Sequence, residues 1–270
     1  MTGKVAVLVI HGMGSQDRAF AEPTKAKINR LIDKKGKDSA DIAWKSVFWA
    51  DITEKRQKKF VDDIVADKNN NLDFIKLRRF VVSALGDAAA YQNVKGKKSS
   101  TYSDINNRVR AAVRELYRED LDEQPCPLII LAHSLGGHIM SSYIWDMQQN
   151  PLASFSDFEN MKHLAGMVTF GCNIPLFSFA YRASDLEPIR FPGASLSPDD
   201  KARADWLNFY DADDVLGYPL SQLNSKFRFI KDKDINSGGL FTSWNPLSHN
   251  GYWTDKDMTR PVARLIAKFL

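Results

Sequence analysis

The sequence predicts an α/β fold: a mostly parallel central sheet of about six strands, with helices on both faces. Short apolar runs of strand length alternate with longer segments whose apolar residues recur at helical spacing. Several of the runs are apolar throughout, as strands covered on both faces are. The chain has 270 residues, 44% of them hydrophobic, which is enough for one large core. We therefore expect a single domain over 1–270.

Each expected element follows from its own pattern of apolar residues. The helical segment Ser103–Glu119, for example, repeats Ile105, Val109 and Val113 at helical spacing. The expected strands are Lys4–Ile10, Ala43–Trp49, Leu128–Leu131, Ala165–Phe170, Trp206–Tyr210 and Lys226–Lys231. The expected helices between them are Ala19–Lys34, Ser103–Glu119, Gly137–Gln149 and Thr259–Leu270.

Composition narrows the classes of function. The net charge is +4, and small lysine clusters near 34–37, 55–59 and 95–98 are interpreted as solvated surface. No nucleic-acid recognition motif accompanies them, so we expect no nucleic-acid partner. No stretch approaches the roughly 18 apolar residues of a membrane span, and no secretory leader is apparent, which favours a cytoplasmic protein.

The two cysteines are expected to be free thiols. Cys126 precedes one expected strand and Cys172 follows the next, so they lie at opposite ends of a parallel sheet. That placement separates them by about 20 Å, whereas a disulfide needs Cα atoms within about 7 Å.

The most informative stretch is Leu128-Ile-Ile-Leu-Ala-His-Ser-Leu-Gly-Gly137, an apolar run that ends in a serine between small residues. A helix-compatible segment follows, which is the pattern of a strand–turn–helix nucleophile elbow at Ser134. The residues two before and two after such a serine must be small, and Ala132 and Gly136 are. Another apolar strand leads into His11-Gly-Met-Gly14, a position that can supply a second backbone N–H for an oxyanion. The expected oxyanion donors are the N–H groups of Met13 and Leu135.

A serine, an aspartate loop and a histidine follow one another along the chain, and this is the order of an α/β-hydrolase triad. From Val5 to Leu270 the chain resembles the α/β-hydrolase superfamily, in particular lipase- and esterase-like members with a His-Gly-x-Gly entry and an Ala-His-Ser-x-Gly-Gly elbow. The resemblance implies that the six strands correspond to the third to eighth strands of the hydrolase sheet.

Elimination among the five histidines selects the base. His11 belongs to the oxyanion loop, His133 adjoins the serine and points away from it, and His138 lies in the helix after the elbow. His163 is expected at the remote end of the sheet. Only His249 follows the last strand and precedes the last helix, where the fold that the resemblance implies delivers its base.

Three aspartates compete for the acid, since Asp211, Asp213 and Asp214 share one loop after the strand at 206–210. The family pattern of an aspartate followed by an apolar residue matches Asp214-Val215 best. Asp213 is the main competitor, and Asp211 is suited to capping the turn.

Three segments exceed what connections require. Residues 51–100 hold two helix-like pieces, Glu54–Ala66 and Leu72–Tyr91, and for the second of these ordinary packing is at least as good an explanation as a cap. Residues 171–204 are aromatic and leave the C-terminal end of a strand, as does the segment 232–248. We interpret 171–204 as a pocket wall or lid for an apolar acyl group. The expected substrate-binding residues are His11, Gly12 and Phe177.

These features predict a serine hydrolase that cleaves a carboxylic ester through an acyl-enzyme on Ser134, with His249 as base and Asp214 as its orienting acid. No cofactor and no metal are expected, because no metal-ligand or nucleotide motif is present. The expected partner is a small-molecule or lipid ester. Two alternatives stay open: an acyltransferase or peptidase with the same triad, and a non-catalytic binding module on a hydrolase fold. The sequence leaves the oligomeric state open.

Overall fold

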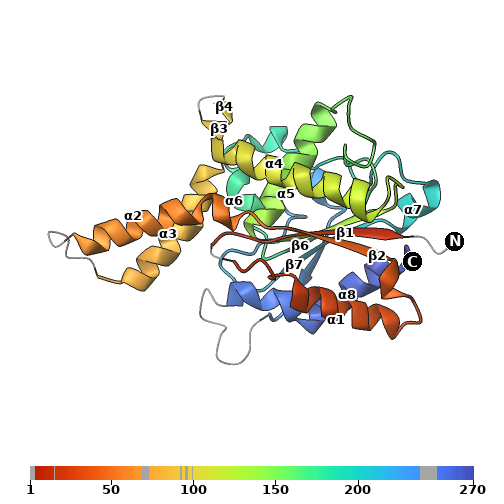
Figure 1. Ribbon diagram of the computed structural model, residues 1–270, viewed down its shortest axis with the longest axis horizontal. Coiled ribbons are helices and arrows are strands. Elements are labelled where there is room, and N and C mark those ends of the chain that lie inside the picture. The colour runs from red at the N-terminus through yellow and green to blue at the C-terminus, as the bar shows by residue number, and fades with distance from the viewer. Residues whose placement is uncertain are drawn as a thin grey trace.

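The computed structural model describes residues 4–14, 16–67, 73–91, 93–94, 97–98, 100–237 and 248–270. Its centre is a six-stranded, all-parallel sheet with the strand order β2-β1-β5-β6-β7-β8. Helices α1 and α8 cover one face of this sheet, and α4 and α5 cover the other (Figure 1). The expected α/β fold class is confirmed.

The elements have the following bounds. The sheet strands are β1 (Val5–Ile10), β2 (Ile42–Val47), β5 (Leu128–His133), β6 (Leu164–Phe170), β7 (Asp205–Tyr210) and β8 (Lys231–Asp234), and a small separate pair is β3 (Asn93–Val94) and β4 (Lys97–Lys98). The α-helices are α1 (Glu22–Asp33), α2 (Glu54–Ala66), α3 (Ile75–Ala90), α4 (Ser100–Glu115), α5 (Leu135–Gln149), α6 (Ile174–Ser178), α7 (Pro198–Arg203) and α8 (Lys256–Ala267). A π-helical turn at Leu116–Asp120 follows α4.

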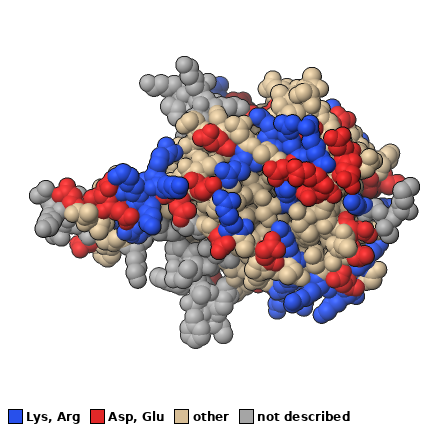
Figure 2. All heavy atoms as spheres, in the orientation of Figure 1, with Lys and Arg blue, Asp and Glu red and all other residues tan. Residues whose placement is uncertain are grey.

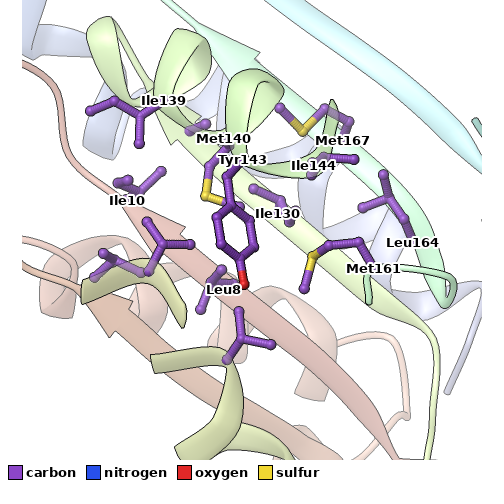
Figure 3. Packing of buried hydrophobic residues seen from close by; sticks show 14 of the residues in the cluster. Leu8, Ile10, Ile130, Ile139, Met140, Tyr143, Ile144, Met161, Leu164 and Met167 are labelled. Carbon is purple, nitrogen blue, oxygen red and sulfur yellow. The ribbon is translucent and has the colours of Figure 1, made fainter. Parts of the chain in front are cut away.

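The core has two halves, one on each face of the sheet. Successive side chains of a strand point to opposite faces, so Ile130 of β5 joins the cluster under α4 and α5 while Ile129 and Leu131 join the cluster under α1 and α8. Every residue of β5 is buried. Figure 3 shows the first half, where the Tyr143 ring of α5 lies among apolar side chains of the helix and the strands below it.

The last strand is the one element whose position the sequence predicted wrongly. The segment expected as a strand at Lys226–Lys231 begins as a short 3-10 turn, Ser225–Phe227, and β8 starts only at Lys231. The side chain of Asn224 accepts a hydrogen bond from the N–H of Lys226 at 2.8 Å, which favours the turn. Because β8 lies at the edge of the sheet and pairs only with β7, it needs no apolar run.

The remaining differences concern where strands and helices begin and end; for example, β2 ends at Val47 instead of Trp49. Helix α1 begins at Glu22 instead of Ala19, and α8 begins at Lys256 instead of Thr259, after the side chain of Asp255 caps it. Helix α2 has the expected bounds, whereas α3 begins at Ile75; Leu72, its expected start, lies outside the described residues.

Both cysteines are free. Cys126 precedes β5 and Cys172 follows β6, and burial raises the pKa of each thiol to about 12. Among the helices of the described residues, none has the length and apolar character to cross a membrane.

Helices α2 and α3 form a hairpin that extends away from the sheet, on the side opposite the two chain termini (Figure 1). An ion pair between Arg79 and Asp62 joins the two helices at 2.9 Å. Basic and acidic side chains are interspersed over this hairpin and over most of the face shown in Figure 2.

Candidate active site

Ser134 lies at the turn between β5 and α5 in a strained backbone conformation. Its φ of 53° and ψ of −126° are rare for a residue with a side chain. The N–H of Ser134 donates to the carbonyl oxygen of Phe170 at 3.0 Å, which ties the turn to β6. A Cβ at Gly136 would stand 2.6 Å from the carbonyl oxygen of His11, so this position has no room for a side chain.

The structure brings Ser134, His249 and Asp214 into one hydrogen-bonded chain. The Ser134 Oγ lies 2.7 Å from Nε2 of His249, and Nδ1 of His249 lies 2.8 Å from Oδ2 of Asp214. In the neutral imidazole, Nδ1–H donates to the carboxylate and Nε2 accepts from the hydroxyl. All three residues are buried, and Ser134 is 0% exposed.

The other two aspartates of the loop have different partners. Asp211 accepts from the N–H of Asp213 at 2.9 Å, and its second oxygen accepts from the N–H and hydroxyl of Ser237. Asp211 therefore stabilises the turn, and the one carboxylate of this loop that meets His249 is that of Asp214.

Asp214 is set up to remain ionised. Burial raises the pKa of its carboxyl, but hydrogen bonds from His249, the Leu216 N–H and the Tyr252 hydroxyl outweigh burial and bring the pKa below its ordinary value. The Tyr252 hydroxyl donates to the same Oδ2 at 2.9 Å. Burial, reinforced by the charge of Asp214, raises the pKa of Tyr252, so that it stays a donor.

Three glycines leave space for this chain of groups. A Cβ at Gly12 would stand 2.5 Å from Cβ of Ser134, and a Cβ at Gly217 would stand 2.7 Å from Oδ2 of Asp214. Gly171 has a φ of +55°, and a Cβ there would stand 3.0 Å from Cε1 of His249. The acid and the base are packed against bare backbone.

The loop after β1 is fixed by His11. The N–H of Trp49 donates to Nε2 of His11 at 3.0 Å, so the proton of the neutral ring is on Nδ1, which donates to the carbonyl oxygen of Gly12 at 2.7 Å. The indole N–H of Trp49 donates to the His11 carbonyl oxygen at 3.1 Å. Burial lowers the pKa of His11 to about 4, which keeps this tautomer neutral.

These contacts change the expectation for His11. Its side chain is 0% exposed and both ring nitrogens are bonded to the backbone, so it does not face a substrate. Gly12 contributes backbone beside Ser134. Leu135 is the first residue of α5, so its N–H belongs to the helix terminus that carries partial positive charge. Met13 packs against the core cluster under α4 and α5.

Sequence reasoning missed the contact between His133 and the loop that carries His249. Its Nε2–H donates to the backbone carbonyl oxygen of His249 at 2.6 Å, and the two rings lie 4.7 Å apart. Burial, together with the neighbouring His249, lowers the pKa of His133 well below its usual value. His133 thus holds the loop that carries His249. No sequence signal marks this contact, or those of Tyr252 and Trp49, because the partners are far apart in the chain.

Phe177, in α6, stacks on His138 with ring centroids 3.9 Å apart and an angle of 5° between the rings. Phe177 is partly buried against the same core cluster as Met13. Most of the expected excursion at 232–248 lies outside the described residues.

Buried neutral histidines make stability depend on pH. Burial lowers the pKa of His138 to about 4. Between pH ~6.5 and ~4, a proton therefore binds to this histidine in the unfolded chain but not in the native state. Stability is therefore complete above pH ~6.5 and is lost as the pH falls toward 4, by about 1.4 kcal/mol per pH unit for each such histidine. We expect urea unfolding to show this loss between pH 7 and 5.

The variant His138→Phe keeps a ring against Phe177 but cannot titrate. It should lose about 2 kcal/mol less than the wild type over the same interval. Equal losses in the two proteins would contradict a neutral His138 in the folded state.

Within the described residues, no three His, Cys, Asp or Glu side chains come together as a metal site would require.

Comparisons with known proteins add little to this geometry. No family model matches the chain, and no curated protein matches it. Among solved structures, the chain is similar to the crystal structure of a novel pyrethroid hydrolase, PytH, with BIF, at 11% identity and a TM-score of 0.34, over 98% of this chain and 97% of that one. The fold class stated above stands on the strand order and pairing of this chain.

Proposed function

We propose that the protein is a serine hydrolase of the α/β-hydrolase kind that cleaves a carboxylic ester. The observation that carries this proposal is the hydrogen-bonded chain from Ser134 through His249 to Asp214, with the serine on a strained strand–helix turn. A serine hydroxyl is a weak nucleophile at neutral pH, and this arrangement supplies the base and the carboxylate that activate it.

In the proposed reaction, Ser134 Oγ attacks the ester carbonyl while Nε2 of His249 takes the hydroxyl proton. Asp214 holds the imidazole in the required tautomer and stabilises the imidazolium. The negative oxygen of the tetrahedral intermediate accepts from the N–H groups of Met13 and Leu135, and the latter adds the positive end of the α5 dipole. The leaving alkoxide takes the proton from His249, which leaves the acyl group on Ser134.

Water then completes the cycle. His249 removes a proton from a water molecule, whose oxygen attacks the acyl carbon. The second tetrahedral intermediate collapses, the carboxylic acid leaves, and Ser134 regains its proton from His249. The chemistry uses only groups of the chain and water.

For the substrate we propose a small-molecule or lipid ester with an apolar acyl group. Met13 and Phe177 belong to the partly buried apolar residues near the loop and α6 and would line its site. We propose that the chain forms one hydrolase domain, with the segments at 51–100 and 171–204 as its cap. An acyltransferase or peptidase would use the same triad, since the acyl-enzyme does not fix the acceptor.

A fluorophosphonate probe and a series of p-nitrophenyl esters of increasing acyl length test the proposal. We expect one probe per chain and turnover of at least part of the series. A non-catalytic binding module would give neither result. Labelling without hydrolysis, together with transfer of the acyl group to an added alcohol or amine, would favour an acyltransferase.

A further inference from the structure

Asp87 is a buried carboxylate outside the proposed triad. It lies near the end of α3, in the α2–α3 hairpin, and is 1% exposed. Its Oδ2 accepts from the backbone N–H of Gly14 at 2.9 Å, and its Oδ1 accepts from the side-chain amide of Gln57 in α2 at 2.6 Å. Asp87 thus links both helices of the hairpin to the loop that follows β1.

No salt bridge joins Asp87 to a lysine or arginine among the described side chains, and beyond the effect of burial the charge of Glu54 raises the pKa of Asp87 further. A buried carboxylate without a cation is unfavourable unless hydrogen bonds satisfy it. Burial accordingly raises the pKa of Asp87, while the bonds from Gly14, Thr53 and Gln57 oppose the rise. The hydrogen bond from Gly14 is therefore one of the few interactions that offset the cost of burying the Asp87 carboxylate.

Two peptide groups flank Met13. The hydrogen bond from Gly14 to Asp87 involves the second of them, between Met13 and Gly14. The other, between Gly12 and Met13, is held by His11, whose Nδ1–H binds the Gly12 carbonyl oxygen. A peptide group is planar and trans, so fixing that carbonyl fixes the opposite direction of the Met13 N–H. Asp87 fixes the next peptide group through the N–H of Gly14, which has a φ of +87°. With both planes held, neither dihedral angle of Met13 is free.

We propose that Asp87 is a positioning residue that keeps the Met13 N–H directed at the oxyanion by holding Gly14. This inference rests on the proposed function, because Met13 is a donor only if Ser134 forms a tetrahedral intermediate. It gives the α2–α3 hairpin a part in the reaction through Gly14, in addition to its proposed place in the cap. Loss of one oxyanion donor lowers kcat by about 10²–10³-fold, and a donor that is misdirected part of the time loses less.

The variants separate the acceptor from the bulk of the side chain. Asp87→Leu keeps the branched shape of the side chain but removes the acceptor, and we expect kcat to fall about 10- to 100-fold with KM nearly unchanged, because the interaction is made in the transition state. Asp87→Asn keeps one oxygen for Gly14 and can donate to Gln57 after that amide turns over. We expect its kcat within about 3-fold of the wild type.

Asp62→Leu is the matched control. It is the same substitution in the same hairpin and breaks the ion pair with Arg79, but it does not reach Gly14. We expect kcat to be unchanged. If Asp87→Leu does not fold, Asp87→Ala, which leaves room for water, replaces it with the same expected direction.

Amide hydrogen exchange over residues 11–14 tests, without any substrate turnover, whether Asp87 holds this loop. Exchange should accelerate in Asp87→Leu and not in Asp62→Leu. If the wild type hydrolyses no ester but exchange responds in this way, the proposed function is wrong, while the finding that Asp87 holds the loop at Gly14 remains. Wild-type kcat in Asp87→Leu, equal losses in Asp87→Leu and Asp62→Leu, or no rescue by Asp87→Asn would overturn the positioning role.

Discussion

Replacing Ser134 by alanine should abolish covalent labelling by a fluorophosphonate and lower ester turnover by at least about 10⁴-fold. The hydroxyl that lies 2.7 Å from Nε2 of His249 is the only part removed, and the hydrogen bond from the Ser134 N–H to Phe170 that ties down the turn remains. The alanine is no larger than serine, so we expect the fold to persist, as circular dichroism and thermal unfolding would show. A small residual rate from the oxyanion donors would remain.

The control is Ser141→Ala, which changes the same residue type two turns further along α5. Its labelling and turnover should match the wild type. Stoichiometric labelling of Ser134→Ala would place the nucleophile elsewhere and remove the basis of the proposed acyl-enzyme.

Asp214→Asn should lower kcat by about 10³–10⁴-fold, whereas Asp213→Asn should change it by less than about 3-fold. An asparagine amide that donates toward Nδ1 would favour the wrong imidazole tautomer, with the proton on the nitrogen that must accept from Ser134. It would also lose the charge that stabilises the imidazolium. Asp213 has no such effect, because its carboxylate does not meet His249.

Steady-state kinetics of both variants on one ester settles the assignment. The comparison is matched, since both substitutions remove one charge from the same loop. If Asp213→Asn is the damaging change and Asp214→Asn is not, the hydrogen bond from His249 to Asp214 does not act in the reaction.

The fold class and the grouping of Ser134, Asp214 and His249 could be inferred from sequence because both follow from chain order. Buried strands are visible in the sequence as apolar runs, and a parallel sheet brings their C-terminal ends to one edge. Strand β8 was missed because it is four residues of alternating charge at the edge of the sheet. Its pairing with β7, and not its composition, makes it a strand.

The groups that support the site could not be inferred in this way. Trp49 binds His11 across 38 positions of the chain, and His133 binds the backbone of His249 across 116. Asp87 reaches Gly14 across 73. None of these residues has a local pattern that depends on its partner, so only the packed structure reveals the contact.

The crowding at Gly12, Gly171 and Gly217 bears on how variation in this chain should be interpreted. These residues offer no functional group, yet the volume that a methyl group would need there is already taken by Ser134, His249 or Asp214. A substitution at any of them displaces a reacting group as directly as a change to that group itself. Intolerance to mutation at these three positions would therefore mean that the space left by a missing side chain is what must be kept. A search for active-site residues by side-chain type alone would overlook these positions.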